Sequence, residues 1–177
     1  MRTITDAQKQ TLEDLSAEGL LQGLPLQTAE KDIHVTELLR GLSKLQVHHG
    51  HFSDLDRRKG ETCRWDRDIR LVFSGGTCLS KAHRLVSRMS EDVDIKVILD
   101  PPEKPFTHNA GDRARLKTLH DLIPQTLHAL GFPLLKYQAG SNPEIRDSHR
   151  YYVVGAGYQT RRQRRTTVRF MSNTRSI

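Results

Sequence analysis

The sequence contains few cysteines and no long apolar run. Its two cysteines, Cys63 and Cys78, are too few for a disulfide framework, and neither belongs to a CxxC pair of the kind that binds zinc. No apolar stretch approaches the roughly 20 residues that a membrane-spanning helix needs. Residues 1–10 also lack the apolar centre of a secretory signal. We therefore expect a cytoplasmic protein with reduced thiols and no membrane partner.

Acidic residues are absent from the last stretch of the sequence, residues 161–177. The whole chain contains 28 Lys and Arg against 21 Asp and Glu, a net charge of +7. Residues 161–177 include six arginines, which leaves 22 basic and 21 acidic residues in the nearly neutral residues 1–160. We predict a basic, disordered tail over residues 161–177. The alternative is that Arg161–Arg165 bind an RNA backbone.

The patterns that are present indicate one domain of mixed class. A length of 177 residues suits one well-buried core. Helices are predicted over residues 5–18, 29–46, 77–88 and 111–130, and strands over 69–73, 92–99, 151–155 and 166–170. Thr28 is the predicted cap of the second helix, and a break is predicted before Pro124. This order indicates a single α/β (α+β) domain over residues 1–177, in which residues 1–66 form an N-terminal helical part.

Asp92 and Asp94 stand on the polar face of the strand predicted over residues 92–99. Side chains of a strand repeat every two residues, so both carboxylates point to the same face, roughly 6.5 to 7 Å apart. Mg²⁺ prefers a few carboxylate oxygens together with substrate phosphates and water. The pair therefore predicts a Mg²⁺ site for a metal-bound nucleoside triphosphate, with a solvated strand edge as the alternative.

A glycine turn precedes this pair in the sequence. Gly75 and Gly76 lack Cβ atoms, so backbone N–H groups can approach a triphosphate closely. Thr77 can cap the next helix or donate to a phosphate oxygen, and Lys81, one helical turn later, can neutralise phosphate charge. An ordinary tight turn and a solvent-facing lysine are the alternatives. Together with the two aspartates, these residues suit phosphoryl or nucleotidyl transfer.

Two motifs in this region resemble those of a known family. Ser74–Lys81 reads Ser-Gly-Gly-Thr-Cys-Leu-Ser-Lys, and Arg88–Ile95 reads Arg-Met-Ser-Glu-Asp-Val-Asp-Ile. They resemble the Gly-Gly-Thr-x-Leu-Ser-Lys and Ser-Glu-Asp-Ile-Asp-Leu motifs of the nucleotidyltransferase AbiEii/AbiGii toxin family of the DNA polymerase beta superfamily. The resemblance covers about residues 27–170 and includes a family helix that is similar to Glu30-Lys31-Asp32. It implies a polymerase-beta-like fold, a mixed sheet flanked by helices.

The resemblance also implies a function and a set of site residues. It implies a Mg²⁺-dependent transfer of a nucleoside monophosphate from a nucleoside triphosphate to an acceptor hydroxyl, with tRNA as the expected acceptor. It further implies a cognate antitoxin and a place in a bacterial toxin–antitoxin or phage-defence pair. The implied site residues are Asp92, Asp94 and Lys81 for catalysis, Asp92 and Asp94 for the metal, and Gly75, Gly76, Thr77, Lys81 and Ser90 for the nucleotide.

One part of the family's site is missing from the sequence. The resemblance implies a third acid on a neighbouring strand, but Thr166–Phe170 contains no carboxylate. The sequence offers Asp147 or Glu144 as a replacement. We therefore expect a C-terminally truncated or diverged member of the family. The alternative function is a catalytically inactive nucleotide- or RNA-binding remnant.

Overall fold

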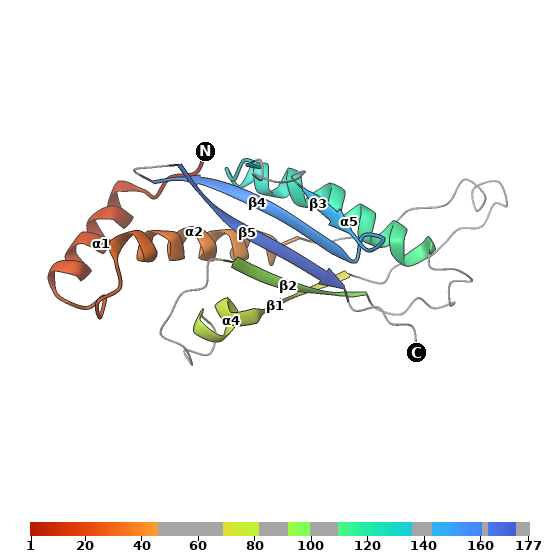
Figure 1. Ribbon diagram of the computed structural model, residues 1–177. Helices are drawn as coiled ribbons and strands as arrows, with labels where there is room; N and C mark the ends of the chain where they lie inside the picture. The colour runs from red at the N-terminus through yellow and green to blue at the C-terminus, as the bar shows by residue number, and fades with distance from the viewer. Residues whose placement is uncertain (46–68, 82–91, 100–109, 136–142, 161–162, 173–177) are drawn as a thin grey trace.

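A computed structural model describes the core of the chain. The described residues are 1–45, 69–81, 92–99, 110–135, 143–160 and 163–172. In chain order the elements are α1 (Asp6–Ala17), α2 (Leu26–Leu42), β1 (Ile69–Ser74), α4 (Gly75–Lys81), β2 (Asp92–Leu99), α5 (Ala110–Ala129), β3 (Glu144–Arg146), β4 (Tyr151–Gln159) and β5 (Gln163–Ser172). Figure 1 shows their arrangement. No helix within the described ranges is long and apolar enough to span a membrane.

The strands form one five-stranded mixed sheet in the order β1-β2-β5-β4-β3. Strands β2 and β5 pair in parallel, and every other neighbouring pair in this sheet is antiparallel. Strands β4 and β5 form a long hairpin, and β5 lies between β4 and β2. The mixed α/β class predicted from the order of elements is confirmed.

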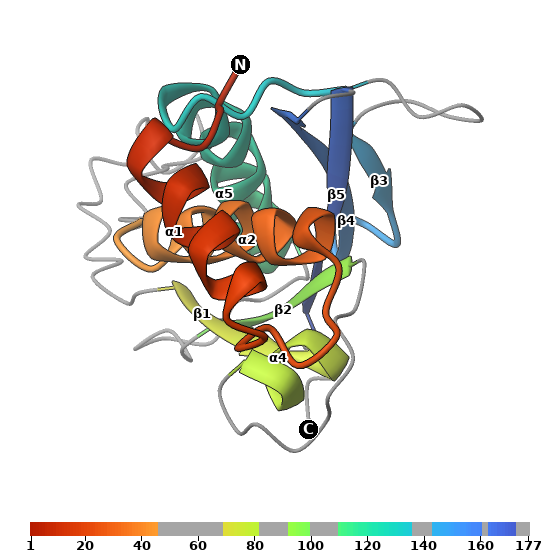
Figure 2. The ribbon, with the colours of Figure 1, turned by 90° about the vertical axis from the view of Figure 1, so that its left-hand side faces the viewer.

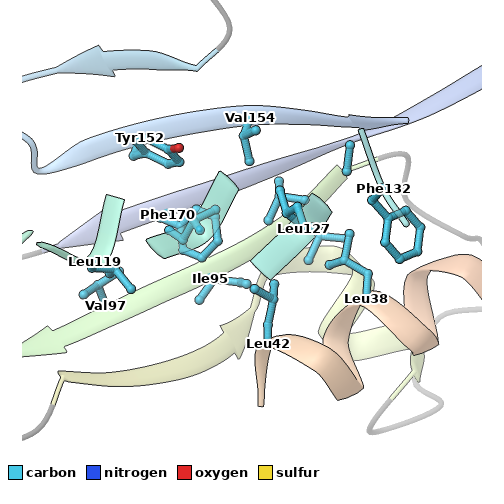
Figure 3. Packing of buried hydrophobic residues seen from close by; sticks show 14 of the residues in the cluster. Leu38, Leu42, Ile95, Val97, Leu119, Leu127, Phe132, Tyr152, Val154 and Phe170 are labelled. Atoms are coloured by element: carbon cyan, nitrogen blue, oxygen red, sulfur yellow. The ribbon is translucent and has the colours of Figure 1, made fainter. Parts of the chain in front are cut away.

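The long helices lie on one side of this sheet. Figure 2 shows α1, α2 and α5 together on that side, with the strands of the β4–β5 hairpin seen nearly edge-on. On β2, the alternate residues Val93, Ile95 and Val97 are buried in the core, because strand side chains alternate between two faces. Figure 3 shows the resulting core, which includes Leu38 and Leu42 of α2, Ile95 and Val97 of β2, Leu119 and Leu127 of α5, Tyr152 and Val154 of β4, and Phe170 of β5.

The first helix begins within one residue of its predicted start, whereas the second begins earlier than predicted. Helix α1 starts after Thr5, which forms a capping box with Gln8. Helix α2 starts at Leu26, so the prediction that Thr28 caps it is wrong. The carbonyl of Pro25 accepts hydrogen bonds from the backbone N–H groups of Thr28 and Ala29, which closes the first turn three residues earlier than predicted.

Helix α5 continues through Pro124, so the predicted break is also wrong. A proline inside a helix leaves the carbonyl four residues earlier without its usual donor. That carbonyl belongs to His120, and the hydroxyl of Tyr152 on β4 donates to it over 3.4 Å. The neighbouring Leu119, Ile123 and Leu127 are fully buried in the core. Tertiary contacts thus compensate for the lost helical hydrogen bond.

The basic end of the sequence confirms one prediction and contradicts another. Residues 163–172 form β5, a central strand, which confirms the strand predicted over residues 166–170 and shows that this part of the predicted disordered tail is ordered. Val168 and Phe170 are buried against the helices, which explains why a basic segment pairs on both sides. Residues 161–162 and 173–177 lie outside the described residues. Strand β3 was not predicted, and β4 extends four residues beyond the predicted end at Gly155.

Candidate active site

Asp92 and Asp94 begin strand β2 and lie on the face of the sheet opposite the core. Val93 between them is buried on the core side. The side chains of Asp92 and Asp94 are 29% and 21% exposed, so both carboxylates reach the surface. The two carboxylates share one face of the strand, as their spacing predicts.

Arg169 of β5 lies beside both carboxylates. In the parallel pairing of β2 and β5, Asp94 is aligned with Arg169. Nη2 of Arg169 is 2.6 Å from Oδ2 of Asp92, and Nη1 is 3.6 Å from Oδ1 of Asp94. Burial alone would lower the pKa of Arg169, but the charge and hydrogen bond of Asp92, with Asp94, raise it overall. The guanidinium therefore remains charged and neutralises about one of the two acidic charges.

Gly75 allows the turn between β1 and α4 to approach Asp94. Its φ is +77°, in the left-handed region that favours glycine. A Cβ atom at this position would collide with Oδ2 of Asp94. Two separate features therefore favour glycine here, the left-handed backbone and the close Asp94 side chain, which would have to shift to admit a Cβ.

Two hydroxyl groups attach this turn to the start of β2. Ser74 donates from Oγ to the backbone carbonyl of Asp94 over 3.2 Å, and Thr77 donates from Oγ1 to the carbonyl of Asp92 over 2.5 Å. Helix α4 starts at Gly75, so the predicted capping role of Thr77 is wrong. Thr77 is fully buried. Its only hydroxyl hydrogen contacts Asp92, so donation to a phosphate would require that bond to break.

Lys81, the last residue of α4, extends toward α2. Its Nζ lies 2.6 Å from Oδ1 of Asp32 and donates to Oγ1 of Thr36 over 2.8 Å. It also donates to the backbone carbonyl of Asp32 over 3.3 Å. Sequence reasoning placed Asp32 on the matching helix but did not identify it as the partner of Lys81. The contact of Lys81 with a triphosphate stays a prediction.

Glu144 and Asp147 do not complete the site, so the predicted third acid is wrong. Glu144 lies on β3, and Asp147 lies in the turn that follows it. Strand β3 is separated from β2 by β4 and β5, and three strand spacings amount to about 14 Å. Glu144 instead pairs with Arg146. The residue beside the aspartates is instead Arg169. The sequence feature that could have identified it is a single arginine between the apolar residues Val168 and Phe170 of a predicted strand.

The residues present can supply part of a Mg²⁺ site. Asp92 and Asp94 provide carboxylate oxygens, the ligands that Mg²⁺ prefers. Within the described ranges, no cluster of three or more His, Cys, Asp or Glu side chains suits a metal ion. The donor set therefore fits a cation that takes its remaining ligands from substrate and water, provided that Arg169 withdraws. Ser90, the other predicted nucleotide-binding residue, lies outside the described residues.

Comparison with known families gives one match. The model of a family described as "Nucleotidyl transferase AbiEii toxin, Type IV TA system" matches residues 66–175, which is more than half of the chain. The matched range includes β1, α4, β2 and β5, the elements that surround Asp92 and Asp94. Searches of curated proteins and of solved structures found no match. The family resemblance drawn from the two motifs is therefore confirmed.

Proposed function

This chain belongs to the AbiEii nucleotidyl transferase toxin family of type IV toxin–antitoxin systems, and from that membership we propose that it is a Mg²⁺-dependent nucleotidyltransferase. Its five-stranded mixed sheet with flanking helices is a nucleotidyltransferase-like fold. The proposed reaction is attack by an acceptor hydroxyl on the α-phosphate of a nucleoside triphosphate. The new bond joins the acceptor oxygen to phosphorus, and pyrophosphate leaves.

The structural observation that carries this proposal is the contact between the Gly75 turn and the Asp94 carboxylate. It brings the proposed triphosphate-binding turn directly against a proposed metal ligand. In the proposal Asp92 and Asp94 hold Mg²⁺, which when bound supplies positive charge to the phosphate oxygens. Gly75 and Gly76 let the triphosphate approach the backbone.

Three more residues have proposed roles toward the triphosphate. Thr77 holds the turn in place through Asp92, and Ser90 contacts the nucleotide. Lys81 contributes positive charge from the end of α4. Since Asp32 and Thr36 already hold its ammonium group, this contribution acts through the electrostatic field unless the side chain moves.

The acceptor and the setting of the reaction are also proposed. The family description supports a toxin that has a cognate antitoxin. We propose tRNA as the acceptor, in the cytoplasm, where both tRNA and nucleoside triphosphates are present. A role in phage defence follows from the same proposal, because modification of tRNA would stop translation in an infected cell.

Label transfer tests this function. The protein is incubated with each α-labelled nucleoside triphosphate, Mg²⁺ and total tRNA, and labelled RNA is measured. Label should enter RNA with the wild type, and Asp94→Asn should reduce the rate at least about 100-fold because a proposed metal ligand is lost. Asp14→Asn, an exposed aspartate on α1, is the matched control and should leave the rate unchanged. Absence of transfer with every triphosphate would contradict the proposal.

One observation favours a second candidate function, nucleotide or RNA binding without turnover. Arg169 lies where it pairs with both proposed metal ligands and reduces their combined charge. A binding protein would retain a nucleoside triphosphate in equilibrium dialysis but transfer no label. Measurement of both quantities on one preparation therefore separates the two functions.

A further inference from the structure

We propose that Arg169 is an internal counter-cation that competes with a divalent metal ion for Asp92 and Asp94. The inference rests on the proposed function in one respect, the role of the two aspartates as metal ligands. The inference goes further because it assigns Arg169 as the ion-pair partner of Asp92 and Asp94 when no metal is bound. It also predicts that the metal and the triphosphate bind cooperatively.

The first argument is the position of the guanidinium. One of its nitrogens is 2.6 Å from an oxygen of Asp92, and the other is 3.6 Å from an oxygen of Asp94. A single planar cation thus contacts both carboxylates, and a divalent ion shared by them would compete with it for their negative charge. The strand register fixes this position, because β5 is paired on both sides, with β2 and with β4.

The second argument is charge. Without Arg169, two carboxylates would stand two residues apart on one face of β2 and would repel each other. With Arg169 the three side chains together have a net charge of −1 instead of −2. A divalent cation is attracted less strongly to this set, and it must also displace two ion-pair contacts before it binds. Arg169 therefore stabilises the metal-free site and opposes the metal.

The third argument is that the side chain can leave. The Arg169 side chain is 34% exposed, so it can turn toward solvent without disturbing the core. Guanidinium groups also bind phosphate oxygens in a bidentate manner. A bound triphosphate offers Arg169 a new partner, so it lowers the cost of releasing Asp92 and Asp94. By linkage, the metal should bind more tightly when a triphosphate is present.

Calorimetric titration with Mn²⁺ alone tests the competition, since Mn²⁺ also prefers carboxylate oxygens and can be confirmed by electron paramagnetic resonance. Arg169→Gln should bind Mn²⁺ about tenfold more tightly than the wild type. The double variant Arg169→Gln/Asp94→Asn should lose this gain. Arg146→Gln is the matched control, because Arg146 pairs with Glu144 on the distant β3 and should bind Mn²⁺ like the wild type. Equal affinity for Arg169→Gln and the wild type would overturn the inference.

Arg169→Lys covers the case in which Arg169→Gln does not fold. Lysine keeps the charge but cannot contact both carboxylates through one planar group, so Mn²⁺ affinity should rise by a smaller factor, about threefold. An affinity identical to that of the wild type would again overturn the inference. Circular dichroism of each variant verifies that the measured change belongs to folded protein.

The cooperativity has its own measurement. Inorganic triphosphate at saturation should increase Mn²⁺ affinity of the wild type more than that of Arg169→Gln, after correction for metal bound directly by the triphosphate. An equal increase in both proteins would exclude release of Arg169 to phosphate.

These results are separable from the test of the proposed function. Label transfer that depends on Asp94, together with unchanged Mn²⁺ affinity in Arg169→Gln, would refute the inference and support the enzyme. Tighter Mn²⁺ binding by Arg169→Gln without label transfer by any protein would support the inference and refute the enzyme.

Discussion

The hydroxyl of Tyr152 donates to the backbone carbonyl of His120, the carbonyl that Pro124 deprives of its helical donor. This contact joins β4 to the middle of α5. Burial, with a smaller effect from Asp121, raises the pKa of Tyr152, so the hydroxyl stays protonated and can donate at every physiological pH. The side chain also stacks on the His120 ring, with ring centroids 4.1 Å apart.

Replacement of Tyr152 by phenylalanine tests this contact. Tyr152→Phe should lower the free energy of unfolding by about 1 kcal/mol, since the His120 carbonyl then lacks a partner in a buried place. Urea denaturation measures the change. In Pro124→Ala the helix regains an N–H donor for that carbonyl, so the same Tyr152→Phe change should cost clearly less there. An equal cost in both backgrounds would show that the hydroxyl acts independently of Pro124.

Gly75→Ala should both destabilise the fold and disturb the site. The left-handed backbone at φ +77° costs a non-glycine residue about 1 kcal/mol or more, and the new Cβ collides with Oδ2 of Asp94. Gly19→Ala is a close control, because Gly19 has φ +70° but nothing within 4 Å of an added Cβ. Thermal unfolding should therefore show a larger loss for Gly75→Ala. Similar losses would mean that the Asp94 contact contributes nothing.

The contact between Lys81 and Asp32 should link α4 to α2 energetically. Lys81→Met and Asp32→Asn are each expected to reduce stability by about 0.5 to 1 kcal/mol, a modest value because Asp32 is 43% exposed. In the double variant the losses should not add, since each change removes the same ion pair. Urea denaturation of the four proteins measures the coupling. Full additivity would contradict a direct ion pair.

Acid should destabilise the protein through His34. Burial, and secondarily the charge of Arg2, lowers the pKa of His34 to about 4 from its ordinary 6.5. Within the described residues neither ring nitrogen has a hydrogen-bond partner. The unfolded chain binds a proton near pH 6.5 while the native state stays neutral. His34 therefore costs no stability above pH 6.5, where it is neutral in both states. The free energy of unfolding falls as pH decreases from 6.5 toward 4.

Through His34, the free energy of unfolding should be about 2 kcal/mol lower at pH 5 than at pH 7.5. Urea denaturation at both values measures it. His34→Phe keeps a ring next to Tyr158 and removes the titrating group, so this variant should lose about 2 kcal/mol less over the same interval. The pKa of His120 is lowered to about 3, chiefly by burial and then by His149, so both proteins retain the remaining acid sensitivity. An unchanged pH dependence would exclude His34.

The site could be predicted from sequence only where its parts are local. Strand alternation places Asp92 and Asp94 on one face whatever surrounds them. The glycine turn before α4 was likewise visible, although the helix begins at Gly75 rather than Thr77. The partner of Lys81 was not visible, because Asp32 lies 49 residues earlier in the chain and approaches Lys81 only when α2 covers the sheet.

Local patterns in the sequence were enough to identify the family motifs, the class of fold and the strand that presents two carboxylates. Only the folded chain shows that Arg169 contacts both carboxylates, that the predicted strand over residues 166–170 lies between β2 and β4, and that the Tyr152 hydroxyl donates to the carbonyl that Pro124 leaves without a helical donor. The physical reason is the same in each case. Strand order and register depend on burial and hydrogen bonds between distant segments, and a shift of one residue in β5 would turn Arg169 to the opposite face.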